Sequence, residues 1–239
     1  IEENVINKKV SEVTSKIEKY PFVENKINEQ VILLKNILRS YGYYFVELET
    51  TINLNNNNTV DLKYNFNLGE IAKIKRINFI GNKIYSDTVL RNIILSEESK
   101  FWKFITRNKF LDASRIKADV NRLNNFYKNR GFYDAKIKST TAIITNENQF
   151  ELLFNIDAGN KYYFDDIKFA DIKKFQLVDQ KFFNKKFKKL KGKNYSEKKI
   201  NNLIDDINDF TLKNDFVFLN ASYDKIIKDK NRIDIIINL

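Results

Sequence analysis

The chain repeats itself, and this constrains its fold more than any other feature of the sequence. Gly42 separates a helical pattern from a strand pattern, and Gly131 does the same 89 positions later. Asp215 takes the equivalent place in a third copy, 84 positions after Gly131. A period of this size predicts an array of three similar modules rather than one large domain.

The residues before each of these three positions carry the same helical pattern. Counting back 15, 11, 8 and 4 positions from each gives the spacing of one buried helix face, and eleven of the twelve residues are hydrophobic or aromatic. We therefore expect one long amphipathic helix in each copy. The twelve residues are Ile27, Val31, Leu34, Leu38, Ile116, Val120, Leu123, Tyr127, Ile200, Ile204, Ile207 and Thr211.

The middle copy predicts the element order β-α-α-β-β. We expect an α+β fold in which each complete copy is a mixed three-stranded sheet covered on one face by two helices. The expected elements are a strand over 71–80, a turn at 81–82, a short helix starting at Ser86 or Asp87, a long helix from Asp112 or Ser114 to Gly131, and strands over 132–144 and 149–157.

The other two copies follow the same order. In the third copy we expect a strand over 162–169, helices over 177–190 and 196–214, and strands over 216–227 and 232–239. In the first copy the opening strand is missing, and we expect helices over 5–19 and 23–41 and strands over 43–54 and 59–68. The predicted domains are residues 1–69, 70–159 and 160–239, with the chain cut inside the first.

Composition excludes most enzyme chemistry. The chain has no Cys and no His, which rules out disulfides, Cys-based metal sites and the commonest general acid or base. The six glycines form no phosphate-binding loop. We expect no catalytic, cofactor or metal site. No apolar run is long enough to span a membrane. Because the chain contains no Met, we expect it to be a piece of a longer protein.

The net charge of +11 has two interpretations. It is typical of a surface that binds nucleic acid or anionic lipid. Alternatively, it reflects heavy use of Lys throughout, which we favour because lysines occur in all three copies. The densest run covers residues 185–191.

The strand after the middle long helix is expected to lie at an open sheet edge. Its residues, 134–141, are mainly lysines and small polar side chains. Such an edge can accept a strand from another chain through backbone hydrogen bonds. The lysines can equally serve only to prevent aggregation, and the sequence leaves these alternatives open.

Two motifs in the middle copy resemble a known family. Ile77-x-Phe79-x-Gly81-Asn82 and Leu123-x-x-Phe126-Tyr127-x-x-x-Gly131-Phe132 are similar to POTRA domains, especially those in the periplasmic arm of the BamA family of outer-membrane-protein assembly factors. The resemblance covers nearly the whole chain but is weaker in the third copy, where Asp171 and Asp215 replace glycines. It places this chain as the second to fourth POTRA domains.

The resemblance implies a non-enzymatic scaffold at the periplasmic face of the outer membrane. Its partners would be unfolded β-barrel precursors, accessory lipoproteins and the protein's own C-terminal membrane barrel, with no nucleic acid. The implied docking edge comprises Ala135, Lys136, Ile137, Lys138, Ser139, Thr140 and Thr141.

An aromatic segment precedes the middle long helix and has two interpretations. Phe101, Trp102 and Phe104 either contact a substrate or a neighbouring subunit, or fold back onto the core of their own domain. We favour the second.

Other functions compatible with the repeat are kept as alternatives. The resemblance to POTRA domains is also compatible with a two-partner secretion transporter, an organelle import channel or a cell-division scaffold, because fold alone does not fix function. A basic nucleic-acid-binding array is the remaining alternative, although the β-α-α-β-β order differs from that of common RNA-binding sheets.

Overall fold

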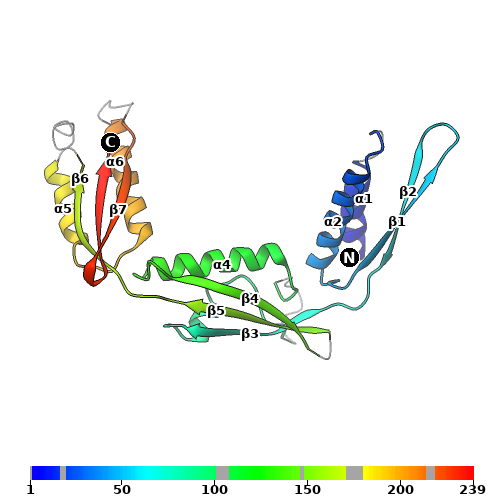
Figure 1. Ribbon diagram of the computed structural model, residues 1–239, viewed down its shortest axis with the longest axis horizontal. Helices are drawn as coiled ribbons and strands as arrows, with labels where there is room; N and C mark the ends of the chain where they lie inside the picture. Colours follow the sequence, from blue (N-terminus) through cyan, green and yellow to red (C-terminus); the bar gives the residue numbers. More distant parts are fainter. Residues whose placement is uncertain (1, 17–19, 101–107, 146–147, 171–179, 214–218) are drawn as a thin grey trace. The chain divides into compact units, whose positions relative to one another are not determined.

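The computed structural model contains three sheets, each with its own helices (Figure 1). It describes residues 2–16, 20–100, 108–145, 148–170, 180–213 and 219–239. By proximity these residues form two compact units, whose boundary runs through the middle sheet. The three predicted domain boundaries therefore stay a prediction.

The first sheet has two strands. Helices α1 (Glu2–Thr14) and α2 (Glu24–Ser40) precede strands β1 (Glu47–Leu54) and β2 (Val60–Asn67), which pair antiparallel. Helix α1 ends at Thr14, earlier than expected. The Thr14 hydroxyl donates to the Val10 carbonyl at 3.1 Å, a local bond that competes with helix continuation.

The second sheet has the order β3-β5-β4. The prediction of a turn at 81–82 was wrong, because β3 continues through both residues. Gly81 has φ +86°, and an added Cβ would lie 2.4 Å from the Ile156 carbonyl oxygen, so only glycine lets the strand pass this close. The elements are β3 (Lys73–Asn82), α3 (Asp87–Arg91), α4 (Ala113–Lys128), β4 (Lys136–Ile144) and β5 (Gln149–Asp157).

The N-terminal cap of α4 is Asp112. Its carboxylate accepts a hydrogen bond from the Arg115 backbone N–H at 2.7 Å, which identifies it, rather than Ser114, as the capping residue. At the other end, Gly131 has φ +103° and follows the last helical turn. The expected helix is thus confirmed, with its end at Lys128.

The third sheet has the order β6-β8-β7 and mixes both pairing directions. Strands β6 and β8 are parallel, while β7 and β8 are antiparallel, as expected for this α+β class. Strand β7 begins at Ser222, later than expected, and Asp215 lies outside the described residues. The elements are β6 (Tyr163–Phe169), α5 (Gln180–Leu190), α6 (Glu197–Lys213), β7 (Ser222–Lys228), a short 3₁₀ turn (Asp229–Asn231) and β8 (Arg232–Asn238).

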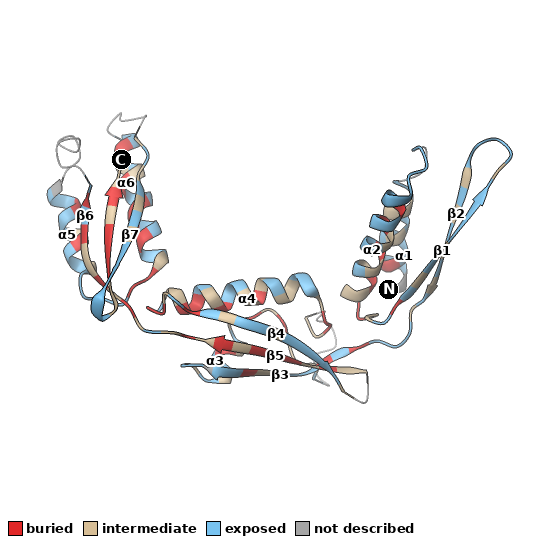
Figure 2. Ribbon diagram, viewed as in Figure 1, coloured by how far each residue is buried: buried red, intermediate tan, exposed pale blue. Residues whose placement is uncertain are grey.

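The core of the third sheet lies between its strands and its two helices. Phe183 and Phe187 of α5 and Ile207 of α6 are buried in one cluster with apolar residues of β6 and β8. Figure 2 shows the buried residues gathered on the inner faces of these elements. Both helices therefore cover the same face of the sheet, in agreement with the predicted fold class.

In two copies, a glycine follows the long helix and bonds to the residue just before the first strand of the next sheet. The Gly42 carbonyl accepts a hydrogen bond from the Ala72 N–H at 2.8 Å, and the Gly131 carbonyl accepts one from the Tyr162 N–H at 2.7 Å. Gly42 has φ +100°, close to the value at Gly131. The repeat seen in the sequence is therefore also a repeat of backbone contacts.

Candidate functional site

Strand β4 lies at the edge of the middle sheet, and its side chains are those of a solvated edge. Lys136, Lys138, Ser139 and Thr141 are exposed, and the Lys138 ammonium lies 2.9 Å from the Asp157 carboxylate. In Figure 2 this strand is mainly exposed, whereas β5 carries alternating buried residues. Six of the seven predicted docking residues lie within β4, from Lys136 to Thr141.

Ala135, the seventh predicted residue, lies before the strand and is buried. Its N–H donates to the Phe132 carbonyl at 3.1 Å, so this group belongs to the turn that follows α4. Farther along the strand, the apolar side chains of Ile143 and Ile144 are 50% and 56% exposed. The exposed edge is thus polar at its start and apolar at its end.

The opposite edge of the middle sheet is closed by the chain itself. The Ile74 N–H donates to the Lys109 carbonyl at 2.7 Å, and the Ile74 carbonyl accepts from the Ser99 N–H at 2.7 Å. Farther along β3, the Ile77 N–H donates to the Glu98 carboxylate at 3.0 Å. Since these groups already have partners, β3 cannot pair with an incoming strand there.

Strand β6 is closed in the same way. The Phe164 N–H donates to the Lys193 carbonyl at 3.0 Å, and the Gly192 N–H donates to the Phe164 carbonyl at 2.8 Å. The bridges Lys73↔Phe110 and Tyr163↔Asn194 occupy equivalent places in the two copies. The segment before the long helix therefore seals the first strand of each complete sheet.

In β4 and just before β7, one backbone N–H donates an equivalent hydrogen bond to the long helix. Asn124 of α4 accepts from the Ile137 N–H at 3.2 Å, and Asn208 of α6 accepts from the Ala221 N–H at 2.7 Å. Within the described residues, no further strand lies beyond β4 or β7 in either sheet. The open edge of each complete sheet is thus always the strand that follows the long helix.

Sequence reasoning missed these two asparagines. Asn124 and Asn208 are 84 positions apart and each follows a buried residue of the repeated helix face, so aligning the copies would have identified them. It also missed Asp119, which is fully buried and accepts hydrogen bonds from the Leu95 and Ser96 N–H groups at 2.5 and 3.2 Å.

A second candidate region is a groove of about 1190 Å³ beside β2. It lies between this strand and the segment joining α1 to α2, and Tyr20, Phe22 and Val23 expose apolar surface there. The predicted contact loop, with Phe101, Trp102 and Phe104, lies outside the described residues.

Neither a metal site nor a membrane-spanning helix is found in the described part of the chain. Among the residues that the structure describes, no group of three acidic side chains lies close enough to hold a metal ion. Among the described helices, none is long and apolar enough to cross a bilayer.

The family comparison matches the middle sheet and its helices. Residues 72–159 match the family model POTRA, described as a surface antigen variable number repeat. These residues form a POTRA domain. The resemblance drawn from the two motifs is thereby confirmed.

Relatives and a solved structure extend the likeness beyond this POTRA domain. The outer membrane protein assembly factor BamA of Neisseria meningitidis serogroup B is 29% identical over 128 residues, which are 54% of this chain and 16% of that protein. BamA of Buchnera aphidicola subsp. Acyrthosiphon pisum is 24% identical over 184 residues, 76% of this chain and 28% of that protein. The chain thus matches less than a third of either relative.

The crystal structure of Haemophilus influenzae BamA POTRA3-5 covers 96% of this chain and 89% of its own, with a TM-score of 0.52 and 14% identity. At this identity the match shows a likeness of fold alone. It does not number the repeats, so their placement as second to fourth stays a prediction.

Proposed function

We propose that this chain is part of a non-enzymatic periplasmic arm in outer-membrane-protein assembly, and that it binds unfolded β-barrel precursors by strand addition to β4. The observation that carries the proposal is the asymmetry of the middle sheet. Its β3 edge is closed by Glu98, Ser99, Lys109 and Phe110, whereas β4 ends the strand order. A precursor strand would continue the sheet by pairing with β4.

Strand addition suits a ligand whose sequence varies. Backbone hydrogen bonds supply affinity that depends little on side chains. The polar start of β4 and its exposed Ile143 and Ile144 match a segment that alternates polar and apolar residues, the pattern of a membrane β-strand. Precursors of β-barrels consist of such segments.

The relatives support the wider assignment. Their names describe outer membrane protein assembly factors. We extend this to propose accessory lipoproteins and a membrane barrel of the same protein as partners, and the periplasmic face of the outer membrane as the location.

A pair of proline substitutions tests the docking edge. Neighbouring residues of a strand direct their N–H groups to opposite sides. The variants Lys138→Pro and Ser139→Pro therefore remove donors on opposite sides of β4. One of these donors faces outward, and the other faces β5. We expect the outward variant to keep the domain's stability and to weaken binding of a barrel-derived peptide at least about tenfold. Fluorescence anisotropy of the labelled peptide and urea unfolding give the two readouts.

The control is Lys138→Gln, which keeps the N–H but removes the charge that pairs with Asp157. It should bind the peptide nearly as well as the unmodified chain. If neither proline variant changes the peptide affinity, strand addition at β4 is wrong.

A further inference from the structure

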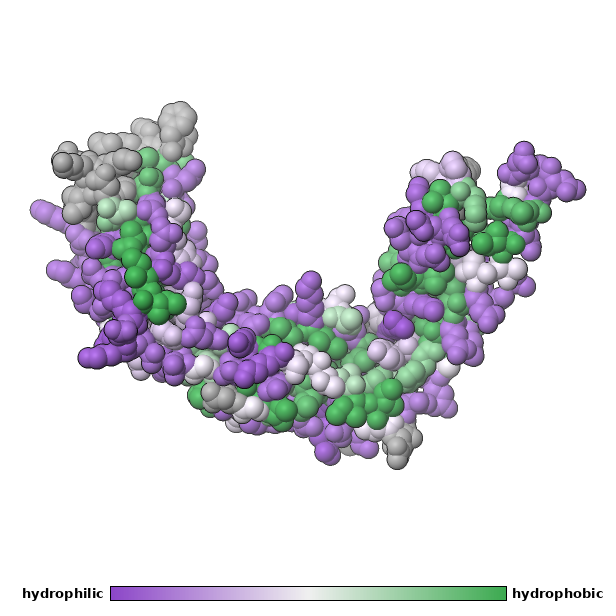
Figure 3. Space-filling view, in the orientation of Figure 1, coloured by the Kyte–Doolittle hydropathy of each residue, from purple (hydrophilic) through white to green (hydrophobic). Residues whose placement is uncertain are grey.

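The outward face of α5 is strongly basic. Seven lysines and no carboxylate occur between Lys181 and Lys193. The helix buries Phe183 and Phe187 in the core. Lys185, Lys188 and Lys189 lie on its other side and are exposed to solvent. In Figure 3, the margin where Figure 1 places α5 is predominantly hydrophilic.

Lys185, Lys188 and Lys189 differ from three other lysines of the same domain, which lie beside carboxylates. The ammonium groups of Lys186, Lys225 and Lys228 lie 2.5 to 3.2 Å from acidic oxygens. In the described part of the chain, the outward α5 lysines at 185, 188 and 189 form no ion pair. Their positive charge is therefore available to an external partner.

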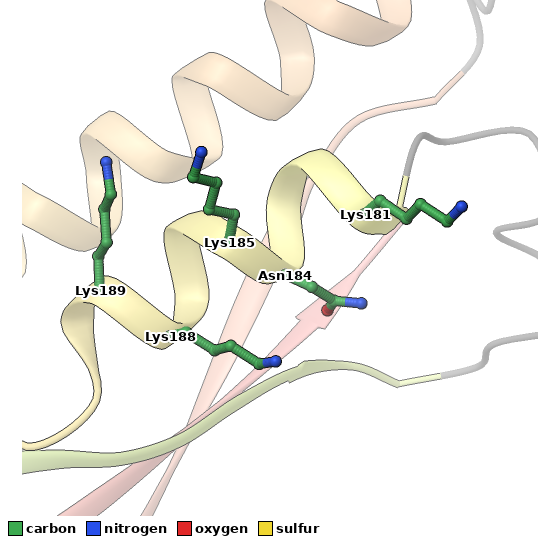
Figure 4. Close-up of a pocket in the computed structure, with 5 residues that line it drawn as sticks. All are labelled: Lys181, Asn184, Lys185, Lys188 and Lys189. Atoms are coloured by element: carbon green, nitrogen blue, oxygen red, sulfur yellow. The ribbon is translucent and has the colours of Figure 1, made fainter.

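The same side chains surround a shallow hollow of about 610 Å³. In Figure 4, Lys185 and Lys189 extend to one side of α5, whereas Asn184 and Lys188 extend to the other. Four lysines and one asparagine line the hollow, and no acidic side chain is among its lining residues. Such a surface offers hydrogen-bond donors and charge to several phosphate groups at once.

We propose that this α5 face binds the surface of a bilayer that contains anionic phospholipids. The proposal rests on the proposed location beside the outer membrane. The hollow has no aromatic lining on which nucleic-acid bases could stack, which disfavours a single-stranded nucleic acid. The apolar face of α5 is buried in its own domain, so association is electrostatic and needs no insertion of the helix.

Vesicle co-sedimentation tests the proposal. The probes are phosphatidylcholine vesicles with and without phosphatidylglycerol, at low salt. Lys188→Gln with Lys189→Gln should lower the partition coefficient for the anionic vesicles about 30-fold, since each lysine near such a surface contributes roughly a fivefold factor. The unmodified chain should bind vesicles of phosphatidylcholine alone only weakly.

The matched control is Lys8→Gln with Lys9→Gln, which removes the same charge from an exposed adjacent pair in α1. Its binding should remain within a few-fold of that of the unmodified chain. Equal losses in the two double variants would overturn the proposal, because net charge alone would then explain binding. Tighter binding of single-stranded DNA through Lys188 and Lys189 would also overturn it. The peptide assay for β4 contains no lipid, so its failure is distinguishable from this one.

Discussion

At the scale of single residues, buried polar groups on the long helices hold the preceding segment in place. Asp119 accepts two backbone N–H bonds from Leu95 and Ser96. In the first copy, Gln30 stands at the equivalent position and donates to the Val13 carbonyl at 2.6 Å. A polar residue on an otherwise apolar helix face is thus explained by the backbone groups it satisfies.

Asp119→Ala should lower the free energy of unfolding by about 2–3 kcal/mol, because the N–H groups of half-buried Leu95 and buried Ser96 would lose their carboxylate acceptor. Urea denaturation followed by circular dichroism measures this. The control Asp205→Ala removes an exposed carboxylate from α6 and should change stability by less than about 0.5 kcal/mol. Equal effects of the two substitutions would contradict the structural role of Asp119.

At the scale of elements, the third sheet repeats the asymmetry of the middle one and defines which groups of β7 face outward. The Ile237 carbonyl accepts a hydrogen bond from the Ala170 N–H, which lies just after β6. The backbone N–H and C=O of Ile237 in β8 are therefore directed away from β7. Tyr223 is its partner across the β7–β8 pair. Tyr223, Lys225 and Ile227 therefore direct their backbone groups away from the sheet, by strand alternation.

Ile226→Pro and Ile227→Pro should separate these two directions. Ile226 pairs with Asp234 and directs its N–H toward β8, so its proline variant should lose about 3 kcal/mol or more of stability. Ile227→Pro should cost clearly less, since the N–H it removes faces solvent. The side chains are matched, being 49% and 51% exposed. Thermal unfolding of both variants measures the difference, and a larger loss for Ile227→Pro would refute the assigned direction.

At the scale of the whole molecule, the core of the third sheet is composed of its own helices and strands. An array of modules that each bury a local core is expected to unfold in more than one step.

Phe183→Ala should lower one calorimetric transition and leave the remaining unfolding nearly unchanged. Phe183 is fully buried, so its truncation should cost about 3–5 kcal/mol. The neighbouring Phe182 is 50% exposed, and Phe182→Ala should have a small effect. A uniform shift of the whole unfolding profile by Phe183→Ala would show that the chain unfolds as one unit.

Much of this architecture was predictable from the sequence, because helices and strands are indicated by the spacing of residues that are close together in the chain. The 4-3-4 spacing before Gly42 and Gly131 gave the long helices, and alternation over residues 149–157 gave β5 with the bounds observed. Element ends were less predictable. Strand β3 continues through Gly81, where its backbone lies close to that of Ile156. This contact is with a distant part of the chain.

By itself, the sequence determined the α+β class, the repeat and the absence of Cys and His chemistry, since residue types and their periodicity are sufficient for these. The sequence predicted an open edge at residues 134–141, but only the tertiary structure decided that the opposite edge of each complete sheet is closed. The groups that close β3 and β6 come from loops 25 to 35 positions farther along the chain, at Ser99, Lys109 and Lys193. Periodicity does not encode such pairings, because hydrogen bonds between distant backbone groups carry no side-chain pattern.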